Sequence, residues 1–345
     1  MRVAIVNDMP MAVEIMSRLL TQSPGYQVAW TAGDGHGAIA RCAEDRPDLI
    51  LMDLVMPGLS GAETIRHIML HTPCPILIVT GSVESHTSKV FEALGAGALD
   101  VVTTPVAGAE EPGEWGSALL AKLRMLSRLV TRRTLTPPAE SAPDKPERSM
   151  TRNRLVVIGA SAGGPAALAT VLGSLPRDFP ASIVIIQHVD AQFSGLLAKW
   201  LNGQSALPVR LAVSGERPQP GTALLAGTND HLVFAGPHGL SYIPEPETCP
   251  YRPSVDVFFE SAARHWKGEV AAVLLTGMGR DGAKGLKALR DRGALTIAQD
   301  QASCIVYGMP KAAVALGAAA EVLPLDLIGP RLARFFPPPG FPSHS

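Results

Sequence analysis

Short, almost wholly apolar segments alternate with stretches of helical periodicity along most of this chain, and this alternation restricts the possible folds more than any other feature. In the first third of the chain the apolar segments read RVAIVND, QVAWTAG, LILMDLV, PILIVTG and DVVTTPV. Strands that are apolar on both faces are typical of parallel sheets buried between helices. The intervening AVEIMSRLL and ETIRHIML have the apolar spacing of helices. Five such strand–helix units predict a small doubly wound α/β domain.

The alternation stops at residues 131–152, where four prolines and mixed charges leave too little apolar surface for a core. It resumes with LVVIGAS, SIVIIQHV, EVAAVLLTGMG and ALTIAQD as strands, and a β-hairpin insertion is expected within 221–243. We therefore predict an α/β chain with two doubly wound parallel-sheet domains, at 1–130 and 153–335, joined by a proline-rich linker. Residues 336–345 are expected to form a disordered tail.

Composition and charge narrow the class of protein. The 345 residues are 46% hydrophobic and carry a net charge of −1. Because the chain has no basic tail or stripe, we expect no nucleic-acid partner. The four cysteines form no CxxC pair, which favours free thiols in a reducing compartment. The chain begins with a strand rather than a signal peptide, and no apolar run approaches the ~18 residues that span a bilayer. We expect a cytoplasmic protein without membrane insertion.

Polar side chains follow three strands of the first predicted sheet. Asn7 and Asp8 follow the first strand, Asp53 the third and Thr80 the fourth. The carboxyl ends of parallel strands meet at one edge of a sheet, and clustered carboxylates there suit a hard cation such as Mg²⁺. A carboxylate beside Mg²⁺ can attack a phosphoryl group. Each residue taken alone could simply cap a helix, but the set in this order favours a phosphoryl-transfer site.

The stretch VVIGASAGGP ends a strand and opens a helix, with Ser161 between Gly159 and Gly163. The spacing matches the G-x-S-x-G turn that exposes a nucleophilic serine at a helix N-terminus. The same stretch imitates a dinucleotide-binding loop, and Asp190 stands after the next strand, where a ribose-binding acid would lie. This turn alone leaves both interpretations open.

Two further residues favour the nucleophile. His188 ends the second strand of this domain, so it should emerge at the same sheet edge as Ser161 and act as the base that a serine hydroxyl needs. Asp281 lies in the glycine-rich loop of LLTGMGRDGAKGL, after a later strand, where it could orient the histidine. Either residue alone could be structural, but three suitable groups at three strand ends predict a Ser–His–Asp site.

The first domain resembles the response-regulator receiver domains, which have a flavodoxin-like fold, and LMDLVMPGLSGAE resembles their phosphorylation segment. The resemblance implies that Asp53 is the phospho-acceptor, that Asp8 and Asp53 bind Mg²⁺, and that Thr80 is a switch residue. Receivers usually have an acid where this chain has Asn7, and a lysine where it has Thr104, the second switch position. These departures predict weaker metal binding and altered phosphate contacts.

The second domain resembles the catalytic domain of the CheB protein-glutamate methylesterases, a Rossmann-like fold. The resemblance rests on VVIGASAGGP, QHV, RPSVDVFFESAA, LLTGMGRDGAKGL and AQDQASCIVYGMPKAA. It implies Ser161 as nucleophile, His188 as base and Asp281 as its orienting acid, with an oxyanion held by the backbone N–H groups of Ala162 and Met278. No cofactor is implied for the ester chemistry.

The resemblance also implies partners. The substrate would be glutamate methyl esters on the cytoplasmic domain of methyl-accepting chemoreceptors, with glutamine deamidation as a side activity. A CheA-like histidine kinase would phosphorylate the receiver. Asn7, NDMPMAVE and TTP look most like the Wsp-type members, which serve surface-sensing systems. Two other functions remain as alternatives: a dinucleotide-binding oxidoreductase, and a non-catalytic receiver-based signalling adaptor.

Overall fold

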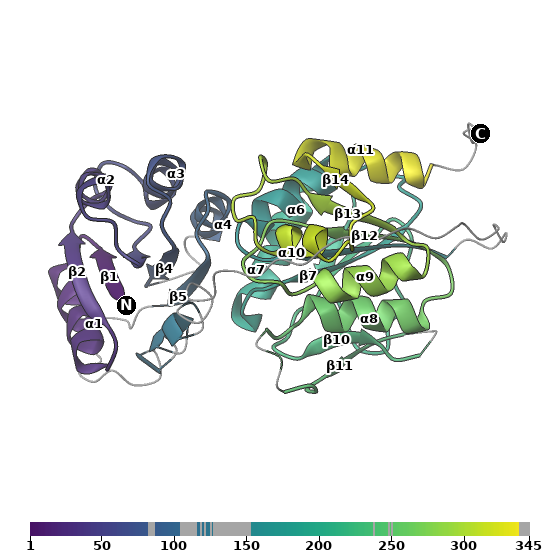
Figure 1. Cartoon of the computed structure of the whole chain (residues 1–345), viewed down its shortest axis with the longest axis horizontal. Helices are drawn as coiled ribbons and strands as arrows, with labels where there is room; N and C mark the ends of the chain where they lie inside the picture. Colours follow the sequence, from purple (N-terminus) through teal and green to yellow (C-terminus); the bar gives the residue numbers. More distant parts are fainter. Residues whose placement is uncertain are drawn as a thin grey trace. The chain divides into compact units, whose positions relative to one another are not determined.

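The chain divides into two compact units, Met1–Thr134 and Leu135–Ser345 (Figure 1). A computed structural model describes residues 1–81, 87–103, 153–236, 239–247, 249 and 251–337, together with eight helical positions between 116 and 126. The expected linker at 131–152 lies outside the described residues. Each unit is therefore described by itself.

The first unit is a five-stranded parallel sheet with strand order β2-β1-β3-β4-β5. Its elements are β1 (Arg2–Val6), α1 (Pro10–Gln22), β2 (Gln27–Ala32), α2 (Gly35–Glu44), β3 (Leu49–Met52), α3 (Gly61–His71), β4 (Ile76–Thr80), α4 (Thr87–Gly95) and β5 (Asp100–Thr103). The predicted doubly wound domain is confirmed. The order reverses between β1 and β3, so the residues after these two strands meet at the crevice where such sheets bind ligands.

The second unit contains a seven-stranded parallel sheet with strand order β14-β13-β12-β6-β7-β9-β8. Its strands are β6 (Arg154–Ala160), β7 (Ser182–Gln187), β8 (Val209–Leu211), β9 (Ala223–Leu225), β12 (Glu269–Leu274), β13 (Leu295–Gln299) and β14 (Glu321–Leu323). Its helices are α6 (Gly164–Gly173), α7 (Ala191–Gln204), α8 (Val255–His265), α9 (Ala283–Asp291), α10 (Met309–Ala315) and α11 (Leu325–Phe335). The second doubly wound sheet is also confirmed, with α6 and α11 on one side and α8 and α9 on the other (Figure 1).

The expected hairpin at 221–243 is only partly correct. Its first segment, β9, joins the main sheet beside β7, and only β10 (His231–Phe234) and β11 (Leu240–Ile243) pair as an antiparallel hairpin. The strands β8 and β14 were not predicted. Each has three residues, which is too short for a periodic signal in the sequence. Strand β8 forms by pairing with β9, and β14 by pairing with β13.

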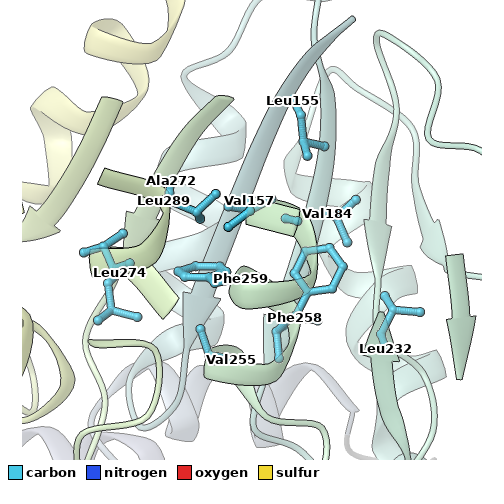
Figure 2. Packing of buried hydrophobic residues seen from close by; sticks show 14 of the residues in the cluster. Leu155, Val157, Val184, Leu232, Val255, Phe258, Phe259, Ala272, Leu274 and Leu289 are labelled. Atoms are coloured by element: carbon cyan, nitrogen blue, oxygen red, sulfur yellow. The ribbon is translucent and has the colours of Figure 1, made fainter. Parts of the chain in front are cut away.

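The core of the second unit holds α8 against the sheet. Phe258 and Phe259 are fully buried and pack with Leu155 and Val157 of β6 (Figure 2). Burying such side chains stabilises the fold by about 1.5–3 kcal/mol each. The first residue of α8, Val255, packs on Gly159 at the end of β6, so tightly that a Cβ on Gly159 would lie 2.3 Å from it. This contact places the N-terminus of α8 beside the turn that carries Ser161.

The second unit extends into the expected tail. Phe336 is fully buried and contacts Phe179, and Arg154 donates a hydrogen bond to the Pro337 carbonyl at 3.0 Å. Residues 336 and 337 therefore belong to the folded unit rather than to the expected tail, and 338–345 lie outside the described residues. Within the parts of the chain that the structure covers, no helix is long and apolar enough to cross a membrane.

Candidate active site and phosphorylation site

Three neighbouring strands bring the predicted catalytic residues to one sheet edge. Strand β6 pairs with β12 on one side and with β7 on the other. Ser161 directly follows β6, His188 directly follows β7, and Asp281 lies in the loop after β12. Because all three strands are parallel, their carboxyl ends place these residues at the same rim of the sheet.

The turn after β6 holds Ser161 by its backbone. The Ser161 N–H donates to the Thr276 carbonyl at 3.1 Å, and the Ser161 carbonyl accepts from the Gly164 N–H at 2.8 Å. Gly163 has a φ of 75°, and a Cβ there would also lie 2.8 Å from Ile305. Only glycine fits this left-handed position, so the second glycine of the motif shapes the turn that starts α6.

His188 and Asp281 are in direct contact. The His188 Nε2 lies 2.8 Å from Asp281 Oδ2, and the two side chains are only 9% and 5% exposed. The ring of Tyr251 stacks on the imidazole, with centroids 4.3 Å apart and an interplanar angle of 3°. The other ring nitrogen, Nδ1, is buried and has no hydrogen-bond partner among the described residues.

Asp281 is held by the start of α8 as well as by His188. Its Oδ1 accepts from the Ser254 hydroxyl at 2.8 Å and the Asp256 N–H at 3.0 Å, and its Oδ2 accepts from the Val255 N–H at 2.7 Å. Burial alone would raise the pKa of Asp281, but the hydrogen bond and charge of His188 and the two helix amides outweigh it, so the pKa is lowered. The carboxyl group is therefore ionised at neutral pH.

Ser161 and His188 are backbone neighbours. The His188 N–H donates to the Ala160 carbonyl at 3.0 Å, and the Gln187 side-chain amide donates to the carbonyls of Ser161 and His188 at 2.9 and 3.1 Å. No hydrogen bond joins the Ser161 hydroxyl to the His188 ring in the part of the chain that is described. The structure thus brings Asp281 into contact with His188 and places the Ser161 backbone next to His188. The hydrogen bond between the Ser161 hydroxyl and the His188 ring is not formed among the described residues.

The two predicted oxyanion donors belong to two loops that meet at Ser161. Ala162 follows it in the turn, and Met278 follows Gly277, whose Cα lies so close that an added Cβ would be 2.8 Å from the Ser161 Cβ. Thr276 ties both loops together, because its hydroxyl donates to the Ala162 carbonyl at 2.9 Å and its own carbonyl accepts from Ser161. Within the described residues, neither amide donates to a protein acceptor.

Several residues that position this site were not singled out from the sequence. They are Gln187, Ser254, Tyr251 and Thr276. Ser254 is the N-cap of α8, and the RPSVD stretch carried that signal. The other contacts join segments that are distant in sequence, and no local pattern reveals them. Asp190, the alternative ribose-binding acid, accepts from the Gln192 N–H and caps α7.

The predicted phosphorylation site of the first unit also lies at strand ends. Asp53 Oδ1 accepts from the Leu54 N–H at 2.6 Å, and Oδ2 accepts from the Asn7 side-chain amide at 3.1 Å. The Asn7 Oδ1 accepts from the Met9 N–H at 2.8 Å. Asn7 therefore directs a donor, not an oxygen ligand, toward Asp53.

The remaining receiver residues follow the same edge. Asp8 is exposed beside Asn7, and Thr80 is 3% exposed at the end of β4, where it pairs with Thr103 of β5. Thr104 lies outside the described residues. The carboxylates of Asp8 and Asp53 are ligands that suit Mg²⁺. No group of three or more His, Cys, Asp or Glu side chains gathers into a metal site in the described ranges.

Comparisons with known proteins identify both units. The CheB methylesterase family matches residues 156–332, and the response regulator receiver domain family matches residues 3–110. A protein-glutamate methylesterase/protein-glutamine glutaminase of Bordetella avium is 55% identical over 342 residues, 99% of each chain. One of Pseudomonas aeruginosa is 52% identical and covers 97% of this chain and 100% of its own.

Among solved structures, the crystal structure of the Thermotoga maritima CheB methylesterase catalytic domain is 37% identical to this chain, with a TM-score of 0.51. The match covers 54% of this chain and 100% of that domain. Together with the relatives that match from end to end, it shows that this chain belongs to the CheB methylesterase family, with a response regulator receiver domain in its first unit.

Proposed function

We propose that this chain hydrolyses glutamate γ-methyl esters on the cytoplasmic domain of methyl-accepting chemoreceptors. The observation that carries the proposal is the buried His188–Asp281 contact at 2.8 Å, at the same sheet edge as the Ser161 turn. The names of the relatives, which pair a protein-glutamate methylesterase with a protein-glutamine glutaminase, support this substrate class.

The ester reaction uses groups of this chain alone. His188 takes the proton of the Ser161 hydroxyl as the oxygen attacks the ester carbonyl, and Asp281 orients the ring and stabilises the imidazolium. The N–H groups of Ala162 and Met278 donate to the oxyanion of the tetrahedral intermediate. His188 then gives the proton to the leaving methoxide, so methanol departs and an acyl-enzyme remains.

Water completes the turnover. His188 takes a proton from the water that attacks the acyl-enzyme and returns it to the Ser161 oxygen as the acyl bond breaks, so that glutamate and free Ser161 result. A glutamine side chain is the amide counterpart of the ester, with ammonia as the leaving group. The same groups therefore support deamidation, in agreement with the second activity in the relatives' names.

The receiver unit makes this activity responsive to phosphorylation. We infer that Asp53 accepts a phosphoryl group from a CheA-like histidine kinase and that Asp8 and Asp53 hold Mg²⁺, which neutralises charge on the transferred group. Thr80 and Thr104 are the residues that would respond to the phosphate. For phosphorylation to activate the enzyme, the phosphate must favour a domain arrangement in which the receptor reaches Ser161. The four cysteines of the chain are free thiols, which supports action in the cytoplasm.

Methanol release from a methylated receptor cytoplasmic domain, with and without acetyl phosphate and Mg²⁺, tests both parts. Ser161→Ala should abolish release, and Asp53→Asn should retain basal release but lose the stimulation. Retained turnover in Ser161→Ala would reject the esterase assignment. Equal stimulation of Asp53→Asn and the wild type would reject the phosphorylation site.

The two alternatives have less support. A dinucleotide-binding oxidoreductase would need a free acid after β7, but Asp190 is engaged as the N-cap of α7. A signalling adaptor would have no use for a buried His–Asp pair beside a serine turn. Quenching of NADH fluorescence by the protein would favour the first alternative. Full receptor signalling by Ser161→Ala in cells would favour the second.

A further inference from the structure

One short segment, residues 251–254, contacts both His188 and Asp281. Tyr251 stacks on the His188 ring with centroids 4.3 Å apart, and three residues later Ser254 donates to Asp281. Tyr251 is only 7% exposed, so the stack is sheltered from water. We propose that Tyr251 is a positioning residue, whose aromatic face holds the His188 imidazole in the plane of Asp281 and stabilises the imidazolium that forms during attack. This inference rests on the proposed esterase function.

The need for a second restraint follows from the ring's hydrogen bonds. Nε2 is bound to Asp281, whereas Nδ1 has no partner among the described residues. A ring held by one hydrogen bond can still turn about its Cβ–Cγ bond. Because the Tyr251 ring lies parallel at 3°, such a turn would drive an edge of the imidazole into the phenol ring. The stack therefore restricts the ring to the orientation in which one nitrogen faces Asp281.

The stack also distinguishes the two charge states of His188. The face of a phenol ring carries negative potential and attracts a cation more strongly than a neutral ring. The imidazole gains a positive charge as it takes the proton of Ser161 during attack. An interaction that strengthens at that point accelerates the chemical step rather than substrate binding. Tyr251 itself stays uncharged at neutral pH, because burial and the charge of Asp281 raise its pKa to about 12.

The ring of Tyr251, rather than its hydroxyl, is the part that acts. The hydroxyl is buried and has no hydrogen-bond partner among the described residues. Tyr251→Phe removes this hydroxyl and keeps the aromatic face, whereas Tyr251→Leu removes the face and keeps an apolar side chain. The two variants therefore form a matched pair.

Kinetics with a methylated receptor should separate them. Tyr251→Phe should keep kcat and KM within about threefold of the wild type, with a melting temperature equal or higher, because an unpaired buried hydroxyl is removed. Tyr251→Leu should lower kcat about ten- to thirtyfold, with KM within about threefold, and should slow labelling of Ser161 by a fluorophosphonate to a similar extent.

The stack has its own spectroscopic signature. Ring current from Tyr251 should shift the carbon-bound ring protons of His188 upfield in protein with ¹³C-labelled histidine, and His188→Gln identifies these signals. The shift should persist in Tyr251→Phe and vanish in Tyr251→Leu. Absence of the shift in the wild type would overturn the inference, even if Tyr251→Leu failed to fold.

Two kinetic results would also overturn it. An unchanged kcat in folded Tyr251→Leu would show that the stack does not position the base. An equal loss in Tyr251→Phe and Tyr251→Leu would assign the role to the hydroxyl. If the wild type released no methanol, the proposed function would fail by itself, while the proton shifts would still decide whether the stack exists.

Discussion

Replacing Asp281 with asparagine should destabilise the start of α8 as well as slow catalysis, because each carboxylate oxygen accepts a hydrogen bond from a backbone N–H. Oδ1 accepts from the Asp256 N–H at 3.0 Å and Oδ2 from the Val255 N–H at 2.7 Å. Either orientation of an asparagine amide therefore sets its NH₂ group against a backbone N–H. The site is 5% exposed, so water cannot relieve the conflict.

The magnitude follows from the hydrogen bonds that an asparagine weakens or breaks. Two charge-assisted hydrogen bonds at about 1.5–3 kcal/mol each predict that Asp281→Asn lowers the free energy of unfolding by about 3–6 kcal/mol at pH 7. Because folding lowers the pKa of Asp281, its contribution is present above the unfolded pKa of about 4 and fades as pH falls below it, and the deficit of the variant should shrink there. The kcat should fall about 10³- to 10⁴-fold, since the imidazolium is left without its counter-charge.

Urea unfolding followed by hydrogen exchange on peptides from α8 measures the loss of stability in the second unit. Peptides from the first unit serve as an internal reference. Asp291→Asn is the matched control, because the same change is made at a side chain that is 56% exposed and paired with Lys287 on the surface. That control should change stability by less than about 1 kcal/mol. Equal urea midpoints for Asp281→Asn and Asp291→Asn, with α8 amides equally protected, would refute this reasoning.

Three further changes test other parts of the structure. Burial and the neighbouring charge of Asp281 raise the pKa of Asp256 to about 6, so the wild type loses stability as pH rises from about 4 to about 6. Asp256→Asn should therefore be more stable by about 3 kcal/mol at pH 7 and equal near pH 4, as urea midpoints would report. Equal midpoints at pH 7 would contradict this. Gly277→Ala places a methyl group 2.8 Å from the Ser161 Cβ and still closer to the flexible side chain of buried Met309. It should lower kcat about a hundredfold in the methanol assay, with the fold intact by circular dichroism. Wild-type turnover would show that the turn can move away. Asn7→Asp should tighten Mg²⁺ binding about tenfold by calorimetry of the full chain, since a donor is replaced by a carboxylate ligand; unchanged affinity would exclude a role of this position in metal binding.

Much of the fold could be predicted because the central strands are unambiguous. Segments such as LVVIGA and SIVIIQ are apolar on both faces, and only a buried parallel sheet accommodates a series of them. The prediction was wrong for two short outer strands and for the start of the C-terminal tail. The three-residue strands β8 and β14 have no period of their own, and Phe336 lies in a proline-rich stretch whose composition indicated disorder although it is buried against Phe179.

The candidate site was likewise predictable only in part from the sequence. A polar residue directly after a buried parallel strand must emerge at the carboxyl edge of the sheet, so Ser161, His188 and Asp53 could be assigned to their edges from the sequence alone. The order of the strands could not be predicted in this way. Whether the loop after β12 lies beside β6 or three strands away depends on pairing between segments more than 100 residues apart.

The local sequence by itself determined which residues stand at strand ends and helix starts, because strand and helix periodicity act over a few neighbouring positions. Only the tertiary structure decided which of them meet: the four donors around Asp281, the Tyr251 ring on His188, and the Asn7 amide on Asp53. The physical reason is that each of these contacts joins separate elements whose distance is set by how the strands order and the helices pack.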